Sequence, residues 1–367
     1  MNIISISTDR NIWQETSAVR ARMIEYGQLF DSLHIIVFSK KGHDLQLVQL
    51  SDNVWAYPTN SFNQWLYIFD AIRLGKQLFA TSYKLQATSW LVTAQDPFET
   101  GFCAWILSRL IGSKLNIQIH TDFLSPYFVK GNVLNRIRVF LADFLLPKAD
   151  GIRVVSDRIK SSLQATSYKL KASPIVLPIF VDVLSIENTQ ITLDLKEKYS
   201  QFSHIILMAT RFAKEKNISL AIDAFIQVLE KLPRAGLIIV GSGPEWDNLR
   251  LKVKAYKLSE SIIFEPWIGF ETLISYYKTT NLLLNTSLYE GYGLIFAEAA
   301  ACNTPIVSTD VGIASEVGAT IADHSASSVA QKILDVLGNP NPSRLLYIIS
   351  KEEYLLDYKS ALLGLAR

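Results

Sequence analysis

The stretch Ser287-Leu-Tyr-Glu290-Gly-Tyr-Gly-Leu-Ile-Phe-Ala-Glu298 decides how this sequence is interpreted. Seven residues separate its two glutamates, and glycines at 291 and 293 follow the first glutamate closely. The apolar run 282–284 before it predicts a buried strand, whereas 295–301 has helical spacing and strong helix formers. The sequence therefore predicts a strand, a glycine-rich turn and a helix in that order.

This turn has the features of an anion site. Glycine lets the backbone turn sharply and approach a ligand closely. The first amides of a helix have no partner inside the helix, so they attract anions. Glu290 in the turn and Glu298 on the first helical turns can both face a ligand bound there. A sugar nucleotide offers phosphates and hydroxyls and suits this combination, although acidic residues are also common at the start of a helix without any ligand.

A second segment places positive charge at the same kind of position. The apolar run 205–208 predicts a strand, and Ala209-Thr-Arg211-Phe-Ala-Lys-Glu-Lys216-Asn217 follows it. Asn217 is the predicted N-cap of a helix from residue 218 to about 231, which has one apolar stripe. Arg211 and Lys216 are therefore loop cations at the carboxyl edge of a strand, where doubly wound sheets bind ligands. Cations, helix starts and acids at one sheet edge predict a pocket for a diphosphate sugar.

With these motifs the sequence resembles family 4 of the retaining glycosyltransferases. The resemblance covers most of the C-terminal half in order, through Arg211-x4-Lys216, the strand and turn 237–244, the Glu290-x7-Glu298 element and the stretch 305–312. Each piece alone is weak, but their order and spacing are specific. The family has the GT-B fold, so the resemblance implies an α/β protein with two Rossmann-like, doubly wound domains that face each other across a cleft.

Length and periodicity support two domains. The chain has 367 residues, more than one hydrophobic core usually serves. Strand-like runs alternate with helical patterns, which implies mostly parallel sheets. Strands are expected at 3–6, 34–38, 54–57, 90–92, 115–119, 152–155, 175–177, 205–209, 237–241, 262–264, 282–285 and 305–308, and N-terminal helices at 17–29, 65–79, 101–110, 134–146 and 157–163.

The domain boundary is expected where Pro174 and Pro178 interrupt an apolar segment. Residues 1–180 are predicted to form an acceptor-binding domain and residues 181–351 a donor-binding domain. The resemblance implies a hinge at the boundary and a C-terminal helix, at about 352–367, that returns to the first domain.

The resemblance also implies roles for the charged residues. Arg211 and Lys216 match the pair that neutralises the donor diphosphate. Because a leaving diphosphate gains negative charge, fixed cations there would stabilise the transition state. Glu298 matches the acid that accepts hydrogen bonds from the ribose hydroxyls. Glu290 matches the acid near the donor sugar and is, with the two cations, a catalytic candidate.

The remaining donor contacts are expected from backbone and apolar groups. The amides of Gly293 and Leu294 would lie against phosphate or sugar. The segment 264–268 matches the stretch that lines the base, so Trp267 and Ile268 are donor-binding candidates. For Trp267, packing in the core is as good an explanation as stacking on the base.

In the N-terminal half, His120 is the catalytic candidate. It follows the predicted strand 115–119, and the resembling family often has a histidine here that contacts the donor sugar. A lone histidine after a strand is more often structural. Asp96 and Glu99 follow another strand end and are acceptor candidates, although an Asp-Pro helix start explains them almost as well.

Two departures from the family concern glycine. Family members often carry a paired-glycine loop after the first strand, whereas residues 8–17 contain none. Either Arg10 and the Ser17 region make that contact differently, or the acceptor geometry has changed. Asn303 stands where glycine is common, a mild change because asparagine tolerates a left-handed backbone.

Gly241-Ser-Gly243-Pro244 lacks the third glycine of a dinucleotide-binding motif. It predicts instead a tight turn with proline at a helix start.

The composition limits the classes of binding partner and the cellular compartment that can be expected. The net charge of +2 gives no support to nucleic-acid binding. The first ten residues lack the features of a secretion signal, and two cysteines, Cys103 and Cys302, fit a reduced cytosol. A cytoplasmic protein is expected. The amphipathic, partly basic stretch 132–148 predicts a core helix or, as an alternative, a peripheral membrane contact.

The expected reaction needs no metal and no cofactor beyond the nucleotide-diphosphate sugar. The chain contains no Asp-x-Asp sequence, the motif with which transferases of another fold hold a metal ion on the donor. Retaining transfer to a glycan, a lipid-linked or a small-molecule acceptor is therefore expected. A non-catalytic nucleotide-sugar-binding protein and a nucleotide-sugar epimerase of the same fold remain alternatives. Neither the base nor the sugar of the donor can be read from these residues.

Overall fold

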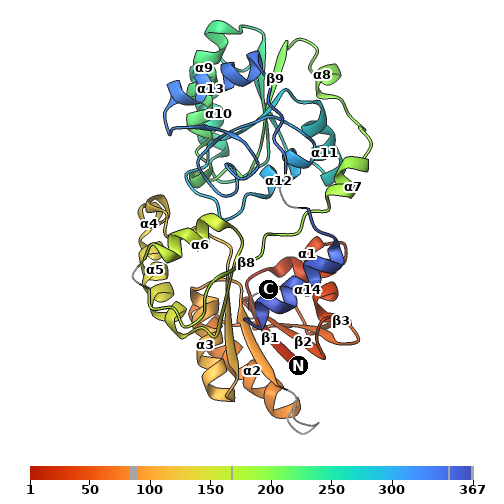
Figure 1. Ribbon diagram of the computed structural model, residues 1–367, viewed down its shortest axis with the longest axis vertical. Coiled ribbons are helices and arrows are strands. Elements are labelled where there is room, and N and C mark those ends of the chain that lie inside the picture. Colours follow the sequence, from red (N-terminus) through yellow and green to blue (C-terminus); the bar gives the residue numbers. More distant parts are fainter. Residues whose placement is uncertain (83–88, 167, 346–347, 365–367) are drawn as a thin grey trace. The chain divides into compact units, whose positions relative to one another are not determined.

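The computed structural model describes residues 1–82, 89–166, 168–345 and 348–364 (Figure 1). Its contacts divide the chain into two compact units. Unit 1 comprises Met1–Pro178 and Ser350–Arg367, and unit 2 comprises Ile179–Ile349. Within the described ranges, no helix combines the length and apolar character needed to cross a membrane.

Unit 1 is built on a mostly parallel sheet of eight strands in the order β3-β4-β2-β1-β5-β6-β7-β8. Its central strands are apolar and buried along nearly their whole length, as expected for a sheet with helices on both faces. After β1 the chain forms β2, β3 and β4 on one side of β1. It then crosses to the other side of β1, where β5 pairs with β1 in parallel. The strands are β1 Asn2–Ser7, β2 Ser32–Val37, β3 Val48–Ser51, β4 Val54–Pro58, β5 Trp90–Ala94, β6 Lys114–Ile119, β7 Gly151–Val154 and β8 Ile175–Val176.

The antiparallel edge strand β3 was not among the expected strands. It has four residues, is only partly buried and pairs with β4 through an irregular register. The helices of this unit are α1 Ala18–Gly27, α2 Tyr67–Ser82, α3 Glu99–Ile111, α4 Pro126–Gly131, α5 Val133–Leu145, α6 Asp157–Gln164 and α14 Lys351–Leu362, with 3-10 turns η1 Arg10–Trp13, η2 Gln64–Leu66 and η4 Leu146–Lys148.

The C-terminal helix α14 packs on unit 1. Ser350 and Glu353 form a capping box at its start. At its other end, Nδ2 of the buried Asn116 donates to the carbonyl oxygens of Ala361 and Leu362, each at 3.1 Å. The rings of Tyr26 and Tyr358 stack with their centroids 3.8 Å apart. Buried amide and ring contacts therefore fix this distant segment on the first sheet.

Unit 2 contains a parallel sheet of six strands in the order β11-β10-β9-β12-β13-β14. The chain runs outward from β9 to β11 and then returns to β12 beside β9, so the two halves of the sheet diverge between β9 and β12. In doubly wound sheets, the crevice at such a switch point is where ligands bind. The strands are β9 His204–Ala209, β10 Ala235–Val240, β11 Ile262–Glu265, β12 Leu282–Asn285, β13 Ile306–Thr309 and β14 Thr320–Ala322.

Helices cover the second sheet around a buried apolar core. Phe225 of α9, Ile239 of β10 and Ile333 of α13 are fully buried in that core. The helices are α7 Val183–Asn188, α8 Leu195–Lys198, α9 Ile218–Lys231, α10 Trp246–Ala255, α11 Phe270–Thr279, α12 Leu294–Ala301 and α13 Ala326–Gly338, with the 3-10 turn η5 Lys214–Lys216. The predicted α/β class with two Rossmann-like, doubly wound domains is confirmed.

Candidate functional site

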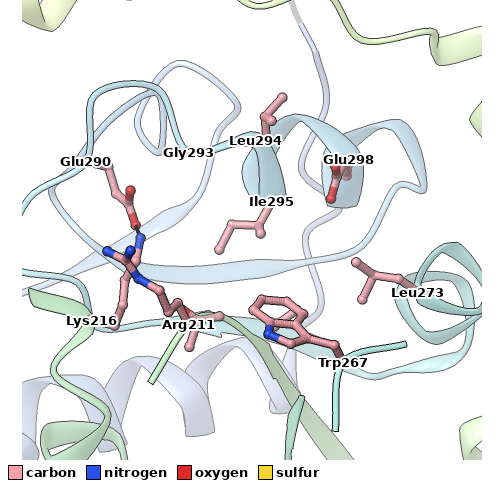
Figure 2. A pocket seen from close by; sticks show the side chains of 11 residues that line it. Arg211, Lys216, Trp267, Leu273, Glu290, Gly293, Leu294, Ile295 and Glu298 are labelled. Carbon is pink, nitrogen blue, oxygen red and sulfur yellow. Dashed lines mark hydrogen bonds and ion pairs between the residues drawn. The ribbon is translucent and has the colours of Figure 1, made fainter. Parts of the chain in front are cut away.

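A pocket of about 410 Å³ opens in unit 2 at the carboxyl ends of β9, β11 and β12 (Figure 2). This is the switch point of the sheet, where the loops after β9 and β12 lie next to each other. The pocket is lined by Ala209, Thr210, Arg211, Lys216, Trp267, Leu273, Glu290, Gly293, Leu294, Ile295 and Glu298. The structure therefore brings both loop cations and both glutamates of the sequence motifs into one cavity.

The two cations lie at the Glu290 end of the pocket. Lys216 Nζ is 2.5 Å from Glu290 Oε1, and their side chains are only 20% and 13% exposed. Arg211 Nη2 is 2.5 Å from Glu215 Oε1, and the Arg211 side chain is 64% exposed. Figure 2 shows the Arg211 and Lys216 side chains next to each other and the ion pair between Lys216 and Glu290. The exposed Arg211 pair is weak, so Arg211 can turn to an anion at little cost.

The glycine pair after β10 holds the Arg211 loop in place. A Cβ atom on Gly241 would lie 1.9 Å from the carbonyl oxygen of Thr210, and one on Gly243 would lie 2.4 Å from that of Phe212. The Phe212 amide donates to the Ser242 carbonyl at 2.8 Å. The loop after β10 therefore packs directly against the backbone on both sides of Arg211. The expected tight turn is present, but Pro244 precedes the N-cap of α10 and is not its first residue.

Hydrogen bonds join the loop after β9 to the loop after β12. The buried Thr286 hydroxyl lies 3.2 Å from the Lys216 carbonyl oxygen and 3.0 Å from that of Asn217. The Leu288 amide donates to the Glu215 carbonyl at 2.7 Å. The Ser287 hydroxyl donates to Glu290 Oε1 at 2.8 Å. Lys216 and Glu290 are thus positioned by one hydrogen-bonded unit, although they are 74 positions apart in the sequence.

The expected cap by Asn217 is wrong in its mechanism. Asn217 does precede α9, but its side chain makes no capping hydrogen bond. It also ends the 3-10 turn η5 and has a left-handed backbone, with φ 47° and ψ 42°. An N-cap side chain reaches the helix amides from an extended backbone, which this residue does not have.

Gly293 is the N-cap residue of α12 and lines the pocket. Its φ of 82° is left-handed, and a Cβ atom here would lie 2.6 Å from the Phe296 ring. Glycine offers no side chain for capping, so the first backbone amides of α12 have no side-chain cap. Gly312 supports the same turn, because a Cβ atom there would lie 2.3 Å from the Tyr292 carbonyl oxygen. Two glycines therefore leave the start of α12 accessible to an anion.

Glu298 lies on the other side of Ile295 from Glu290 in Figure 2. Burial raises the pKa of Glu298, and a hydrogen bond from Tyr277 opposes that increase. The Tyr277 hydroxyl donates to Glu298 Oε2 at 3.2 Å. Tyr277 was not singled out from the sequence, because an aromatic residue before a buried strand is indistinguishable there from a core residue.

Trp267 belongs to the pocket and not to the core. It is 55% exposed and lies near Arg211 and Leu273 (Figure 2). Ile268 is not among the residues that line the pocket.

The strand end before Trp267 is fixed by a buried acid. Glu265 accepts hydrogen bonds from Lys198 Nζ and the Tyr276 hydroxyl, each at 2.7 Å, and from the Tyr199 hydroxyl. Burial alone would raise the pKa of Glu265, but these donors outweigh burial and lower it. This network was not predicted, because its members are far apart in the sequence.

The candidates of the N-terminal half lie in unit 1. His120 follows β6 and is exposed. Arg10, in the 3-10 turn η1 after β1, donates from Nε to the carbonyl oxygen of Phe38, which follows β2, at 3.1 Å. Ser17 is the N-cap of α1 and accepts from the Arg20 amide at 3.1 Å. Arg10 and Ser17 therefore both have structural roles in the glycine-free loop.

Asp96 and Glu99 lie at the start of α3. Asp96 accepts from the Phe98 amide at 2.8 Å, and burial raises its pKa. Glu99 is in an ion pair with Arg138 of α5 at 3.0 Å. The Asp96 contact matches the helix-start explanation, whereas Glu99 pairs with a residue of another helix. Asn303 has the left-handed backbone expected of it, with φ 56°. Among the described residues, no three His, Cys, Asp or Glu side chains form a group that could hold a metal ion.

Two solved structures share the fold of this chain. The sucrose-phosphate synthase of Thermosynechococcus elongatus matches with a TM-score of 0.71 and 18% identity, over 100% of this chain and 95% of that one. Anabaena HepE in complex with UDP and glucose matches with a TM-score of 0.67 and 16% identity, over 99% and 92%. The two Rossmann-like units are therefore those of the GT-B fold.

The second unit resembles a known protein family. Residues 195–351 match the family "Glycosyl transferases group 1", a range that contains every residue lining the pocket. Over this range, which is less than half of the chain, the sequence is similar to these glycosyltransferases.

Two curated proteins are similar to this chain over part of their length. An alpha-monoglucosyldiacylglycerol synthase of Streptococcus pneumoniae is 26% identical over 57% of this chain. An N-acetyl-alpha-D-glucosaminyl L-malate synthase of Bacillus anthracis is 25% identical over 59%. The matched part spans about half of each relative, 50% and 55%.

Proposed function

We propose that this protein is a retaining, metal-independent glycosyltransferase that moves a sugar from a nucleotide-diphosphate sugar to a glycan, lipid-linked or small-molecule acceptor. The observation that carries the proposal is the single pocket that combines Arg211, Lys216, the start of α12 and two glutamates. Cations and helix amides suit a diphosphate, and the acids suit hydroxyl groups.

The donor would lie along this pocket with its diphosphate at the cation end. Arg211, Lys216 and the amides of Gly293 and Leu294 would hold the phosphates. Glu298 would accept hydrogen bonds from the ribose hydroxyls, and Trp267 would lie against the base. Glu290 would face the donor sugar, and its pairing with Lys216 reduces its repulsion of the nearby phosphates.

The proposed reaction breaks the bond between the anomeric carbon and the β-phosphate oxygen. An acceptor oxygen forms the new bond on the same face of the sugar, and its proton passes to the leaving phosphate. Arg211 and Lys216 would stabilise the charge that accumulates on that phosphate. With two protein cations in the phosphate region, we expect no requirement for a metal ion or another cofactor. His120 remains a proposed catalytic residue.

The name of one of the two relatives, a monoglucosyldiacylglycerol synthase, suggests a lipid acceptor, and α5 of unit 1 fits this idea. Its outer face carries Val133, Ile137, Phe140 and Phe144, of which Val133 and Phe140 are about 70% exposed (71% and 69%). Lys130 and Arg136 are exposed beside this stripe, and Lys148 Nζ lies 3.7 Å above the Phe144 ring. An apolar stripe with flanking cations suits a bilayer surface that contains anionic lipid.

We therefore include peripheral membrane contact at the cytoplasmic face in the proposal. The test is flotation of the protein with liposomes, with and without anionic lipid. Phe140→Asp should reduce flotation. Leu251→Asp, which changes an equally exposed residue of unit 2, should have no effect. Failure of the unchanged protein to float would remove the membrane contact from the proposal and leave the transferase intact.

The transferase itself is tested in two steps. A thermal-shift screen with uridine, guanosine and adenosine diphosphates and their sugars identifies the donor. NMR of the product then gives its anomeric configuration, which should match that of the donor, and turnover should persist with a chelator. Inversion or strict dependence on a divalent ion would contradict the proposal.

Two alternatives predict different products. A non-catalytic sugar-nucleotide-binding protein would bind the donor without hydrolysis or transfer. An epimerase would convert the donor without any acceptor. Retention of all four charged residues in the pocket favours the transferase.

A further inference from the structure

Tyr277 lies directly behind the pocket and not in it. It belongs to the last turns of α11, is 1% exposed and is absent from the pocket lining. Its hydroxyl donates to Glu298 Oε2 at 3.2 Å. The Thr304 hydroxyl donates to the Tyr277 carbonyl at 2.7 Å, which holds this turn of α11 against the loop after α12. A buried tyrosine thus contacts the acid of the pocket from the protein side.

This contact matters because Glu298 is buried. A carboxylate that accepts hydrogen bonds from two ribose hydroxyls must be ionised and held in one orientation. Burial opposes ionisation, and a phenol donor favours it. With Oε2 held by Tyr277, Oε1 and the remaining lone pair of Oε2 are available to a ligand.

We propose that Tyr277 is the positioning residue for ribose recognition: it orients the Glu298 carboxylate toward the vicinal hydroxyls of the donor. This inference rests on the proposed function and deepens it. It also predicts the specificity of the site. The pocket discriminates ribose from dideoxyribose through Glu298, and this discrimination depends on the Tyr277 hydroxyl.

The adjacent residue provides a matched control. Tyr276 is also fully buried and also donates its hydroxyl to a buried glutamate, but that glutamate is Glu265. Tyr276→Phe and Tyr277→Phe therefore remove the same atom from neighbouring positions on α11. Only Tyr277→Phe removes a donor from the acid that lines the pocket.

The experiment measures binding of the preferred nucleoside diphosphate and of its 2′,3′-dideoxy analogue by calorimetry. Tyr277→Phe should weaken binding of the ribonucleotide about 10-fold and leave binding of the dideoxy analogue nearly unchanged. Tyr276→Phe should leave the ratio of the two affinities as it is in the unchanged protein. In a Glu298→Gln background, Tyr277→Phe should have no further effect on this ratio.

Other outcomes would overturn the inference. An equal loss of affinity for both nucleotides would show that Tyr277 only supports the fold, as would the same ratio in the Tyr277→Phe and unchanged proteins. An additional loss of ribose preference in the Glu298→Gln background would show that Tyr277 does not act through Glu298. If the unchanged protein bound no nucleoside diphosphate at all, the proposed function would fail first.

Discussion

Replacement of Lys216 by methionine is the most direct test of the pocket. Lys216 Nζ is 2.5 Å from Glu290 Oε1 and is mostly buried, so its charge is little screened by water. Lys216→Met keeps the length and apolar stem of the side chain and removes only the ammonium group. We expect weaker binding of a nucleoside diphosphate and little change in binding of the corresponding nucleoside.

The expected size follows from the contacts that are lost. A hydrogen bond to a charged group contributes about 1.5–3 kcal/mol. The loss of Lys216 also leaves Glu290 without its cation, next to the proposed phosphates, so the upper half of this range applies. About 2–3 kcal/mol corresponds to a roughly 30- to 150-fold increase in Kd for the diphosphate. Adding Glu290→Gln to Lys216→Met should recover part of this loss, because it removes the uncompensated negative charge.

The assay is calorimetric titration with the nucleoside diphosphate and with the nucleoside. Lys214→Met is the control, because Lys214 lies on the same 3-10 turn, is exposed and does not line the pocket. It should leave both affinities within about 2-fold, since an exposed charge contributes little. The reasoning is refuted if Lys216→Met and Lys214→Met weaken the diphosphate equally, or if Lys216→Met weakens the nucleoside as much as the diphosphate.

Two further predictions concern the scaffold. Gly243→Ala should destabilise unit 2 by about 1–3 kcal/mol in urea unfolding, because the added Cβ would meet the Phe212 carbonyl oxygen at 2.4 Å. Gly269→Ala, with no heavy atom within 4 Å, should change stability little, and equal effects of the two would contradict this explanation. His34 is buried between Trp55 and Trp90, and burial lowers its pKa to about 4. Because the unfolded chain takes up this proton first, the unfolding free energy should fall by up to about 3 kcal/mol as the pH drops from about 6.5 to 4. His34→Gln should remove most of this slope, and an unchanged slope would assign it to other groups.

The sheets could be predicted wherever the strands are continuous apolar runs. The run 205–208 and the run 282–284 both predicted strands that the structure contains as β9 and β12. β3 and β14 were missed because they are edge strands of four and three residues with few buried side chains. In such segments the pairing partner, and not the local sequence, determines the strand.

The site could be predicted only where residues follow strand ends. Arg211 comes after β9 and Glu290 after β12, so sheet topology alone brings them to one edge. Tyr277 and the donors to Glu265 act across the packing of different elements, which no local pattern reveals. The cap by Asn217 failed for a related reason, because the left-handed turn before α9 depends on the preceding 3-10 turn.

Glu290 and Glu298 belong to one motif but have different surroundings, and this difference suggests that they bind different parts of the donor. Glu290 contacts the Lys216 ammonium and the Ser287 hydroxyl, beside the region proposed to bind phosphate. Glu298 accepts a hydrogen bond from a neutral donor, the Tyr277 hydroxyl, and burial raises its pKa, so it suits neutral hydroxyls better than charged groups. The first turn of α12 lies between them, and a helix advances about 1.5 Å per residue. The seven-residue spacing then places the binding of sugar and phosphate at the Glu290 end and the binding of ribose at the Glu298 end. An insertion in this turn should therefore uncouple the affinity for the sugar diphosphate from the affinity for the ribose and not abolish both.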